Sequence, residues 1–599
     1  MAESALKHFY ISEEQSIYLL SQNDARKLKQ WVQLCMSQLE QLGYRDISLI
    51  GKGAYGFVFA GSSSLGVQKV FKFSRVNLPE KVQARLEEEA FMQQQVCHPQ
   101  VPEMLAFERV GKQSILMMRR APGEDLEKIS LSRGPLPARW TVQIAAQLVN
   151  LLKALRADSR RTQVHGDIKP SNIVYDADTE QVCLIDWGSS VFAQLEADGQ
   201  PAATSIQGLM SEDMNHSNAR LGDVYFIGPE QLDGALSSPR FDEQGVASTL
   251  YALASGQSCR FGHRVIPASA LGLPQEFART LDNLLADEPE LRQKAGDYLL
   301  TNMARMARTY FAEDDWQIPA PLVPVWLRES EEAIDSVVYS SRRSFLMAGG
   351  ENRELLAMDD VQLEKYYKNY LVGMGDTEKA FIAAVSRLGH YPVVGGLAIH
   401  WLEGEVAIDA SLNLYSAEHQ RAFYAAVNTM VTLARAIKRE GTFKSCMFNA
   451  RSTLHIERSH ESHPFVPPPG MSLPYEVQPA PPVDERNRHS YFEDGRDPDE
   501  QLVLPQEIIS CVEQLNDMHH TGCIIFESLP QHLRIHNYYV LLEPDKEVQF
   551  KALLARILAA VPDITGIGTA GYMKLPYKNT RRFEPIEQVA ERFYPKDPR

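Results

Sequence analysis

A short stretch of the chain, residues 165–172, brings together three side chains whose chemistry suits phosphoryl transfer. It contains an acid, Asp167, a lysine two positions later, Lys169, and an asparagine three positions beyond that, Asn172. Transfer of a phosphoryl group needs a carboxylate that accepts or orients a hydroxyl proton, a cation near the group in transit and oxygen ligands for magnesium. Asp167 and Lys169 are therefore the candidate catalytic residues, and Asn172 is a candidate metal ligand.

A second acid lies fourteen positions after Asn172. The apolar run at residues 182–185 leads directly into Asp186, which is followed by Trp187 and Gly188. This pattern predicts a buried strand that ends at a carboxylate, beside a glycine that lets the chain turn. Carboxylate oxygens suit magnesium, so Asp186 is the second candidate metal ligand.

A glycine-rich stretch lies earlier in the chain, with Gly51, Gly53 and Gly56 just before Val58. Glycine lets the backbone approach phosphate groups closely, although this pattern alone also fits a flexible hairpin. Lys72 follows Val58 by 14 positions and stands between strand-forming apolar residues. A buried ammonium is costly unless it has partners, and nucleotide phosphates together with a glutamate would supply them.

The order and spacing of these motifs resemble those of the eukaryotic-like (Hanks-type) protein kinases, bacterial serine/threonine kinases among them, over about residues 46–310. The resemblance implies ATP and Mg²⁺ as cofactors. It implies that the glycine-rich stretch and Val58 cover the phosphates and that Lys72 contacts the α and β phosphates. It also assigns the magnesium ions to Asn172 and Asp186.

The family pairs the strand lysine with a glutamate on the next helix, here expected at residues 80–95. Glu89 lies nine positions before His98, which is where the family places this glutamate, so Glu89 is preferred over Glu88. The resemblance also places Met118 at the back of the nucleotide pocket.

The same resemblance assigns roles within the catalytic stretch. Asp167 would orient the acceptor hydroxyl, and Lys169 would stabilise charge on the phosphoryl group in transit. Gly166 stands where kinases that are switched on by phosphorylation carry an arginine, whose guanidinium binds the new phosphate. Phosphates in segment 189–217 are therefore predicted to change the rate little, unless another basic residue such as Arg220 takes that place.

Three further residues match structural positions of the family, and no chemistry is assigned to them. Glu230, in a Gly-Pro-Glu sequence, is expected to form a buried ion pair with Arg292. Asp242 is expected to brace the catalytic stretch from a buried helix.

The composition excludes several other classes of protein. The chain has 599 residues, a formal net charge of −16 and 44% hydrophobic residues, which is ordinary for a globular protein of several domains. The acidic balance argues against general nucleic-acid binding. No apolar run is long enough to span a membrane, and the N-terminus lacks the pattern of a signal peptide. Seven scattered cysteines indicate neither a disulfide framework nor a zinc site, so a cytoplasmic location is expected.

The expected fold class is α+β, a bilobal protein-kinase-like fold followed by one or two smaller α+β domains. The predicted parts are an N-terminal helical extension (1–45), a kinase domain (46–315), a connector (316–350), a C-terminal α+β domain (351–462), a Pro-rich linker (463–500) and a second α+β unit (501–599).

The order helix, strand, strand, helix, strand is expected twice in the C-terminal half. Gly396 precedes Phe423 by 27 residues, and Gly522 precedes Phe550 by 28. A tandem duplication is one interpretation of this pattern, although residue identity between the two parts is poor.

The leading prediction is an ATP-dependent serine/threonine protein kinase that acts on protein substrates, with residues 320–599 recruiting substrates or partners. The sequence does not indicate the oligomeric state. One alternative is a small-molecule kinase resembling the aminoglycoside and choline phosphotransferases, which share the His-Gly-Asp and Ile-Asp-Trp motifs. Lys169 and the Glu230–Arg292 pair favour a protein kinase over that group. The other alternative is a pseudokinase scaffold, which loss of a catalytic position would favour; none is lost.

Overall fold

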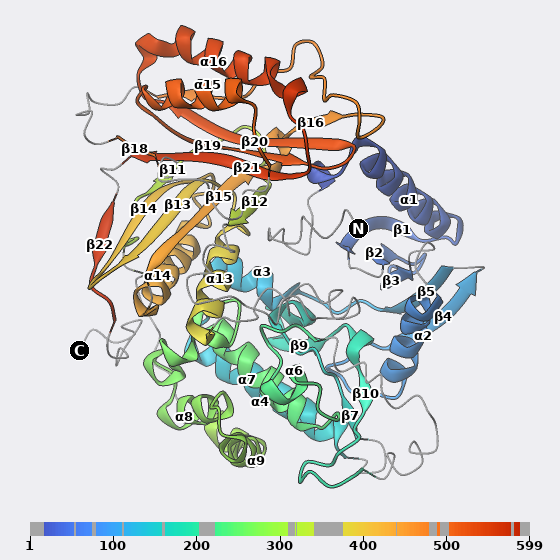
Figure 1. Cartoon of the computed structure of the whole chain (residues 1–599). Helices are drawn as coiled ribbons and strands as arrows, with labels where there is room; N and C mark the ends of the chain where they lie inside the picture. The colour runs from blue at the N-terminus through green and yellow to red at the C-terminus, as the bar shows by residue number, and fades with distance from the viewer. Residues whose placement is uncertain are drawn as a thin grey trace. The chain divides into compact units, whose positions relative to one another are not determined.

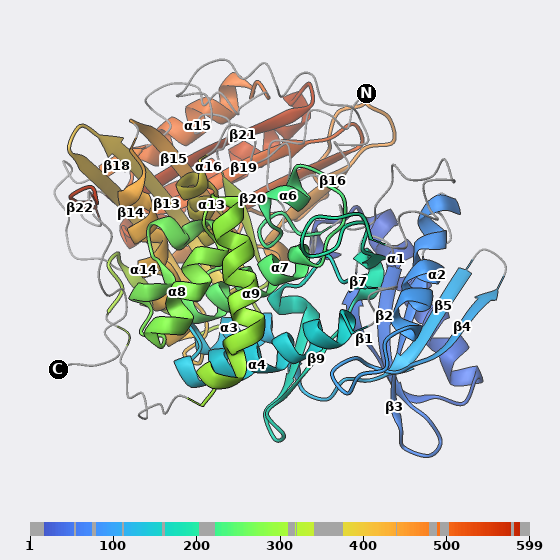
Figure 2. The same cartoon turned by 90° about the horizontal axis from the view of Figure 1, so that it is seen from below.

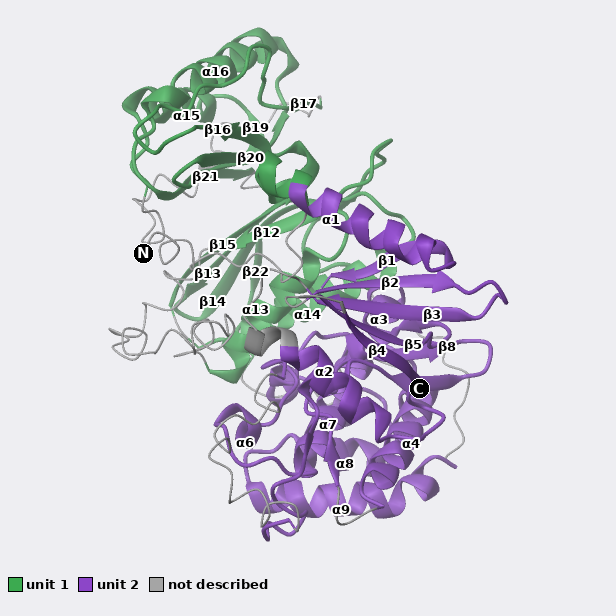
Figure 3. Cartoon of the chain, turned by 90° about the vertical axis from the view of Figure 1, so that its right-hand side faces the viewer, with its two compact units in different colours: residues 1–26, 319–587 green, residues 27–318, 588–599 purple. Residues whose placement is uncertain are grey.

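The structure, a computed structural model, describes most of the chain. The described residues are 17–52, 56–74, 80–110, 113–157, 162–202, 222–308, 318, 320–340, 375–438, 440–478, 488–490, 502–576 and 580–586. The chain divides into two compact units, which Figure 3 shows in different colours. We call residues 27–318 with 588–599 the motif unit, because they contain the motifs described above. Residues 1–26 with 319–587 are the C-terminal unit.

The motif unit begins with a five-stranded antiparallel sheet in the order β1-β2-β3-β5-β4 (Figure 1). Its strands are β1 (Arg45–Lys52), β2 (Gly56–Ser62), β3 (Gln68–Ser74), β4 (Met104–Val110) and β5 (Gln113–Arg119). Side chains alternate between the faces of a strand. Phe71 and Phe73 of β3 therefore join a buried cluster that includes side chains of α1 (Gln22–Gln41). Lys72 lies between them on the other face, where α2 (Glu80–Gln94) packs.

The rest of the motif unit is mainly helical (Figure 2). Its longer helices are α3 (Leu126–Arg133), α4 (Ala138–Leu155), α7 (Arg240–Ser255), α8 (Gln275–Leu284) and α9 (Pro289–Met306). Every residue of α7 after its first is buried. Short strands lie against this helical part: β6 (Glu124–Asp125), β8 (Ile173–Asp176) and β9 (Gln181–Leu184) form one sheet, and β7 (Gln163–Val164) pairs with β10 (Val191–Phe192). The candidate catalytic stretch connects β7 to β8.

The described residues of the C-terminal unit form two repeats of eight helices and strands in the same order. The first repeat contains β11 (Val325–Leu327), β12 (Ser336–Ser340), α13 (Asp376–Leu388), β13 (Val393–Leu402), β14 (Glu405–Leu414), α14 (Gln420–Ala436), β15 (Gly441–Asn449) and β16 (Leu454–Glu457). The second contains β17 (Glu476–Val477), β18 (Arg488–Ser490), α15 (Gln506–Asn516), β19 (His520–Ser528), β20 (His532–Leu541), α16 (Glu547–Ala559), β21 (Gly568–Pro576) and β22 (Arg581–Phe583).

Strand register shows that the two repeats are equivalent residue by residue. Partners across the three central strands are Gly395, Leu412 and Met447 in the first repeat, and Gly522, Tyr539 and Lys574 in the second. Each residue of the second set lies 127 positions after its counterpart (522 minus 395, 539 minus 412, 574 minus 447). The buried helix residues Phe423 and Phe550 have the same separation.

The equivalent glycines are needed for the same reason. A Cβ added to Gly395 would lie 1.8 Å from the carbonyl oxygen of Ser411, and a Cβ on Gly522 would lie 2.5 Å from that of Tyr538. Ser411 and Tyr538 again occupy equivalent positions. The structure thus supports the duplication, with Gly395 rather than Gly396 as the counterpart of Gly522.

The last strand of each repeat belongs to the sheet of the other repeat. β16 of the first repeat pairs antiparallel with β20 of the second, and β22 of the second pairs antiparallel with β14 of the first. Ile456 opposite Leu533 corresponds to Phe583 opposite Val406, so the exchange is reciprocal. Neither sheet is complete without a strand from the other repeat.

The two six-stranded sheets of this unit face each other across a shared apolar layer, and the helices cover their outer sides (Figure 1). Val394 and Phe448 of one sheet and Ile525 and Leu575 of the other belong to this layer. Two stretches expected as connecting segments contribute to the sheets: β11 and β12 fall within 316–350, and β17 and β18 fall within 463–500. Among the described residues, no helix combines the length and apolar character that a membrane span requires.

Candidate active site

Lys72 lies between two carboxylates. Its Nζ donates to Glu89 Oε1 of α2 at 2.5 Å and to Asp186 Oδ1 at 2.8 Å. Of the neighbouring glutamates it is therefore Glu89 that contacts the lysine. Burial by itself lowers the pKa of the Lys72 ammonium, but Asp186 and Glu89 outweigh this effect and raise it. The pKa of Asp186 is lowered to about 2, mainly by the charge of Lys72, so Asp186 is ionised at neutral pH.

The turn after β9 brings Asp186 to this position. Asp186 adopts the left-handed conformation, with φ 65°, which is uncommon for a residue other than glycine. The next residue, Trp187, is fully buried, and its indole N–H donates to the carbonyl of Leu184 at 3.3 Å. The apolar strand and the buried indole hold the turn, so the half-exposed Asp186 carboxylate has a fixed place.

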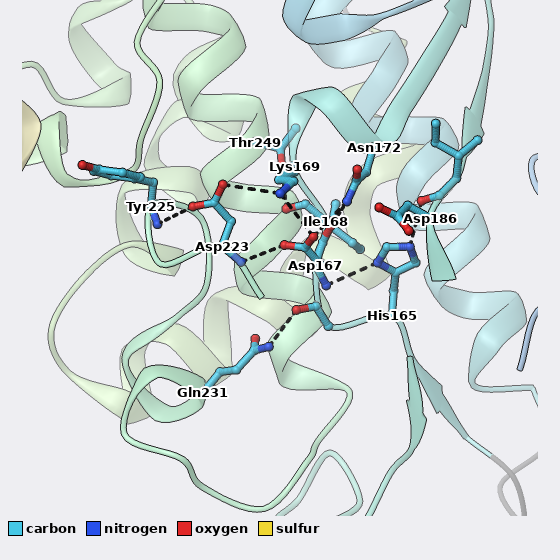
Figure 4. A network of polar contacts seen from close by, with 12 residues as sticks. His165, Asp167, Ile168, Lys169, Asn172, Asp186, Asp223, Tyr225, Gln231 and Thr249 are labelled. Carbon is cyan, nitrogen blue, oxygen red and sulfur yellow. Dashed lines mark hydrogen bonds and ion pairs between the residues drawn. The ribbon is translucent and has the colours of Figure 1, made fainter. Parts of the chain in front are cut away.

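Three donors fix the carboxylate of Asp167 (Figure 4). Its Oδ1 accepts from the main-chain N–H of Asp223 at 2.8 Å, and its Oδ2 accepts from Asn172 Nδ2 at 3.0 Å. The Nζ of Lys169 lies 3.3 Å from the same Oδ2. The three residues predicted from the spacing of the stretch are thus in direct contact.

The backbone of the catalytic stretch is held from the helical part of the motif unit. Asp242, at the start of α7, accepts from the N–H groups of His165 and Gly166 at 2.8 and 2.9 Å. Gln231 Nε2 donates to the carbonyl of Gly166 at 2.7 Å, and Thr249 Oγ1 donates to that of Ile168 at 3.2 Å. These contacts hold the backbone of the loop from the helical part and do not use the side chains of Asp167 and Lys169.

Arg292 and Glu230 form the ion pair expected from the sequence. Arg292 is 5% exposed, and Gln244 Nε2 donates to the other oxygen of Glu230 at 2.9 Å. Glu230 lies in α6 (Pro229–Leu232), so the pair anchors the end of the segment that carries Asp223.

The glycine-rich stretch spans the end of β1 and the start of β2. Gly51 pairs with Val58, and Val58 in turn is the register partner of Lys72. A Cβ on Gly56 would lie 2.0 Å from the carbonyl oxygen of Phe73, so strand packing alone requires glycine there. Gly53 lies outside the described residues.

Met118 lies on β5 and is buried, at 4% exposure, against Ala90 of α2. It is on the same side of the sheet as Lys72, and its place behind the nucleotide stays a prediction.

Asn172 and Asp186 provide the oxygen chemistry that a magnesium ion needs. Both hydrogen bonds of Asn172 to Asp167 use its Nδ2, so its amide oxygen is the atom left to bind a metal. The Asp186 carboxylate is ionised and 48% exposed. Hard cations prefer such carboxylate and amide oxygens, and these two residues fit the ion that the motif implies.

The sequence alone did not single out Asp223. Its contact with Asp167 spans 56 residues and uses a main-chain N–H, which any residue except proline supplies. The available signal was its position seven residues before Glu230, at the end of the segment that follows Asp186.

Comparison with known proteins agrees with this geometry. Residues 44–300 match the family model for the protein kinase domain. A protein named probable serine/threonine-protein kinase PkwA, from Thermomonospora curvata, is 29% identical over 290 residues, which cover 46% of this chain and 35% of the relative. Probable serine/threonine-protein kinase PknB from Lactococcus lactis is 24% identical over 251 residues, which cover 41% of this chain and 37% of the relative. Serine/threonine-protein kinase PrkC from Bacillus subtilis is 24% identical over 219 residues, which cover 36% of this chain and 30% of the relative.

The chain spans less than two fifths of the length of each of these relatives. The matched residues coincide with the part of the motif unit that contains the Lys72, Asp167 and Asp186 contacts. Residues 44–300 are a protein kinase domain, and this part of the chain is similar to the bacterial serine/threonine kinases of the Hanks type.

Proposed function

We propose that the chain is an ATP-dependent serine/threonine protein kinase, which transfers the γ-phosphoryl group of Mg-ATP to hydroxyl groups of protein substrates. The observation that carries this proposal is the position of Lys72 between Glu89 and Asp186, at 2.5 and 2.8 Å. Alignment of nucleotide phosphates in protein kinases depends on such a lysine–glutamate pair beside a metal-binding aspartate.

In this proposal each polar side chain has one task. Asp167, whose carboxylate is fixed by three donors, orients the acceptor hydroxyl and takes its proton. Lys169 stabilises negative charge on the phosphoryl group in transit, and Lys72 aligns the α and β phosphates. A magnesium ion held by Asn172 and Asp186 would neutralise charge on the phosphates.

The Glu230–Arg292 pair favours a protein acceptor over a small molecule. It anchors the end of the segment that, in the protein kinases this chain resembles, positions the peptide substrate. We also propose that the C-terminal unit recruits substrates or partner proteins. Its sequence shows no nucleotide-binding motif and no nucleophile motif.

The test is to incubate the purified chain with labelled ATP and a lysate of its own host, and then to map the label. We expect label on serine and threonine hydroxyls of proteins, dependent on Mg²⁺. Label that appears only on small molecules would favour the aminoglycoside-kinase type of activity, and no transfer at all would contradict the proposal.

A chain that ends near residue 315 tests the division of tasks. We expect it to autophosphorylate but to label fewer lysate proteins than the full chain. Soluble and folded but inactive protein would contradict a purely recruiting role for the C-terminal unit.

A further inference from the structure

Helix α1 covers the side of the five-stranded sheet that is opposite to Lys72 (Figure 3). Within the motif unit it carries apolar residues three and four positions apart, which form one face of a helix. These residues are Leu28, Trp31, Val32, Cys35, Met36 and Leu39. They join one cluster with four phenylalanines of β2 and β3, which are at most 3% exposed: Phe57, Phe59, Phe71 and Phe73. Because side chains alternate along a strand, α1 packs behind the two strands that present Val58 and Lys72 on their other face.

One ring of α1 lies next to the glycine-rich stretch. The ring centroids of Trp31 and Phe57 are 4.8 Å apart, at an interplanar angle of 48°. Phe57 is 3% exposed and stands between Gly56 and Val58 in the sequence. Aromatic pairs of this kind stabilise a structure beyond the area that they bury. Contact with Trp31 therefore supports the start of β2 from behind.

The other strand of the glycine-rich stretch receives less support. β1 is at the edge of the sheet, and its register with β2 shifts twice. Two of its apolar side chains, Leu49 and Ile50, are 43% and 42% exposed. β2, in contrast, pairs with β3 in regular register along its whole length. The position of the stretch therefore depends mainly on β2 and on the residues that pack behind it.

Glycine has a cost as well as a use at a phosphate site. It lets the backbone approach the phosphates, but it also loses more conformational freedom than any other residue when it becomes ordered. A ligand binds more tightly when this ordering has already been completed in the free protein. A rigid β2 would supply such preorganisation.

We propose that Trp31 is a positioning residue for the nucleotide phosphates, which holds β2 through Phe57 so that the glycine-rich stretch keeps the position that phosphate binding requires. This inference rests on the proposed kinase function. It deepens that function, because Trp31 lies outside residues 44–300, which match the kinase domain, and yet would share in nucleotide binding.

The experiment separates binding of phosphates from binding of the nucleoside. The substitution Trp31→Leu removes the ring but keeps an apolar side chain that favours a helix, so we expect α1 to stay folded. Calorimetric titration of the full chain gives the dissociation constants of Mg-ADP and of adenosine, which has no phosphate. For Trp31→Leu we expect Mg-ADP to bind about three- to tenfold more weakly. Adenosine should bind within about twofold of its affinity for the unaltered chain.

Two further variants show whether the ring and its place are what matters. Trp31→Phe keeps a ring and should bind Mg-ADP within about twofold of the unaltered chain. Leu39→Ala is the matched control, because Leu39 is 1% exposed and belongs to the same cluster, about two turns further along α1. It leaves a cavity, so it should lower the unfolding temperature at least as much as Trp31→Leu does. It should nevertheless change neither dissociation constant.

A merely structural role of Trp31 gives a different result. Equal weakening of Mg-ADP and adenosine in Trp31→Leu would overturn the proposal, as would a Leu39→Ala chain with the same selective loss. Unchanged binding of Mg-ADP to Trp31→Leu, or a Trp31→Phe chain that behaves like Trp31→Leu, would also overturn it. If Trp31→Leu does not fold, Phe57→Leu tests the same contact from the strand, and unchanged binding of Mg-ADP there would count against the proposal.

Failure of the proposed function would be visible separately. If the unaltered chain binds Mg-ADP but transfers no phosphate from Mg-ATP, the kinase function fails, and the two dissociation constants still decide the role of Trp31. If the unaltered chain does not bind Mg-ADP, both proposals are wrong.

Discussion

Each unit contains a cluster of charged side chains, and the two clusters differ in their access to solvent. In the motif unit the Asp186 carboxylate that pairs with Lys72 is 48% exposed. In the C-terminal unit Glu527 is 3% exposed, and its Oε2 accepts from Arg534 at 2.9 Å and lies 3.5 Å from His536 Nε2. Burial alone would raise the pKa of Glu527, but His536 and Arg534 outweigh burial and lower it to about 2.

The difference agrees with a ligand-binding role proposed for one cluster and a structural role for the other. A group that binds phosphate or metal must remain accessible, and the Asp186 carboxylate is accessible while it stays paired with Lys72. The Glu527 cluster has its partners inside the protein and includes Tyr339 of the first repeat, whose hydroxyl lies 2.8 Å from His536 Nε2. Buried ion pairs of this kind are costly to break. The hydrogen bond between Tyr339 and His536 connects this one to the first repeat.

The largest expected effect is on catalysis in the motif unit. Asp167→Asn removes the carboxylate that would take the hydroxyl proton, so we expect turnover to fall by about 10²–10⁴-fold. Binding of Mg-ATP and thermal unfolding should stay close to those of the unaltered chain. Asp178→Asn, an exposed acid in a turn of the same unit, is the control for kinase assays. Wild-type turnover of Asp167→Asn would show that the role assigned to Asp167 is wrong.

The opposite outcome is expected in the C-terminal unit. Glu527→Gln leaves Arg534 buried without its charged partner, and we expect it to lower the free energy of unfolding of this unit by about 3–5 kcal/mol. Phosphorylation of a short peptide should be nearly unchanged. Calorimetry with and without Mg-ATP identifies the transition of the motif unit, because only that unit should be stabilised by the nucleotide. A transition of the C-terminal unit that does not move would mean that the Glu527 cluster contributes little to stability.

Strand exchange predicts an effect at a distance along the chain. A chain that ends at residue 579 lacks β22 and with it the pairing to β14, the hydrogen bond from Thr580 to Asp409 and the ion pair of Arg582 with Glu405. We expect the C-terminal unit to lose about 2–4 kcal/mol of stability.

The measurement is amide hydrogen exchange. In the shortened chain we expect faster exchange in β14, which begins at Glu405, far from residue 579 in the sequence. A chain that ends at residue 586 keeps β22 and is the matched control. Unchanged exchange in β14 would show that β22 is dispensable for the sheet of the first repeat.

Spacing in the sequence predicted the contacts of the motif unit because chemistry restricts residue types at each position. Counting back from His98 selected Glu89, and Glu89 is the glutamate that contacts Lys72. Spacing did not predict the contact of Asp223 with Asp167, because that contact uses a backbone N–H, which carries no residue preference.

The duplication was harder to predict because packing restricts only the apolar character of a position. Gly395 and Gly522 must be glycine because a carbonyl oxygen of the adjacent strand lies too close for a Cβ. Their strand partners Leu412 and Tyr539 are both buried but differ in residue type. The adjacent Gly396 shifted the apparent spacing by one residue. The exchanged strands β16 and β22 span four and three residues, too few for a hydrophobic period to show.

The smallest expected effect concerns phosphorylation of segment 189–217. Residues 203–221, which include the end of this segment and Arg220, lie outside the described residues. Gly166 has no side chain that could bind a new phosphate. Its N–H donates to Asp242 and its carbonyl accepts from Gln231, and neither partner lies in that segment. The catalytic stretch is thus held by contacts that need no phosphate, and we expect phosphorylated and phosphatase-treated enzyme to differ by less than about threefold on one protein substrate. The measurement compares the two forms after mass spectrometry has confirmed their phosphorylation. If phosphorylation raised the rate a hundredfold or more, equivalent to about 2.7 kcal/mol, another cation would have to bind the phosphate. The substitution Gly166→Arg would then increase this activation little.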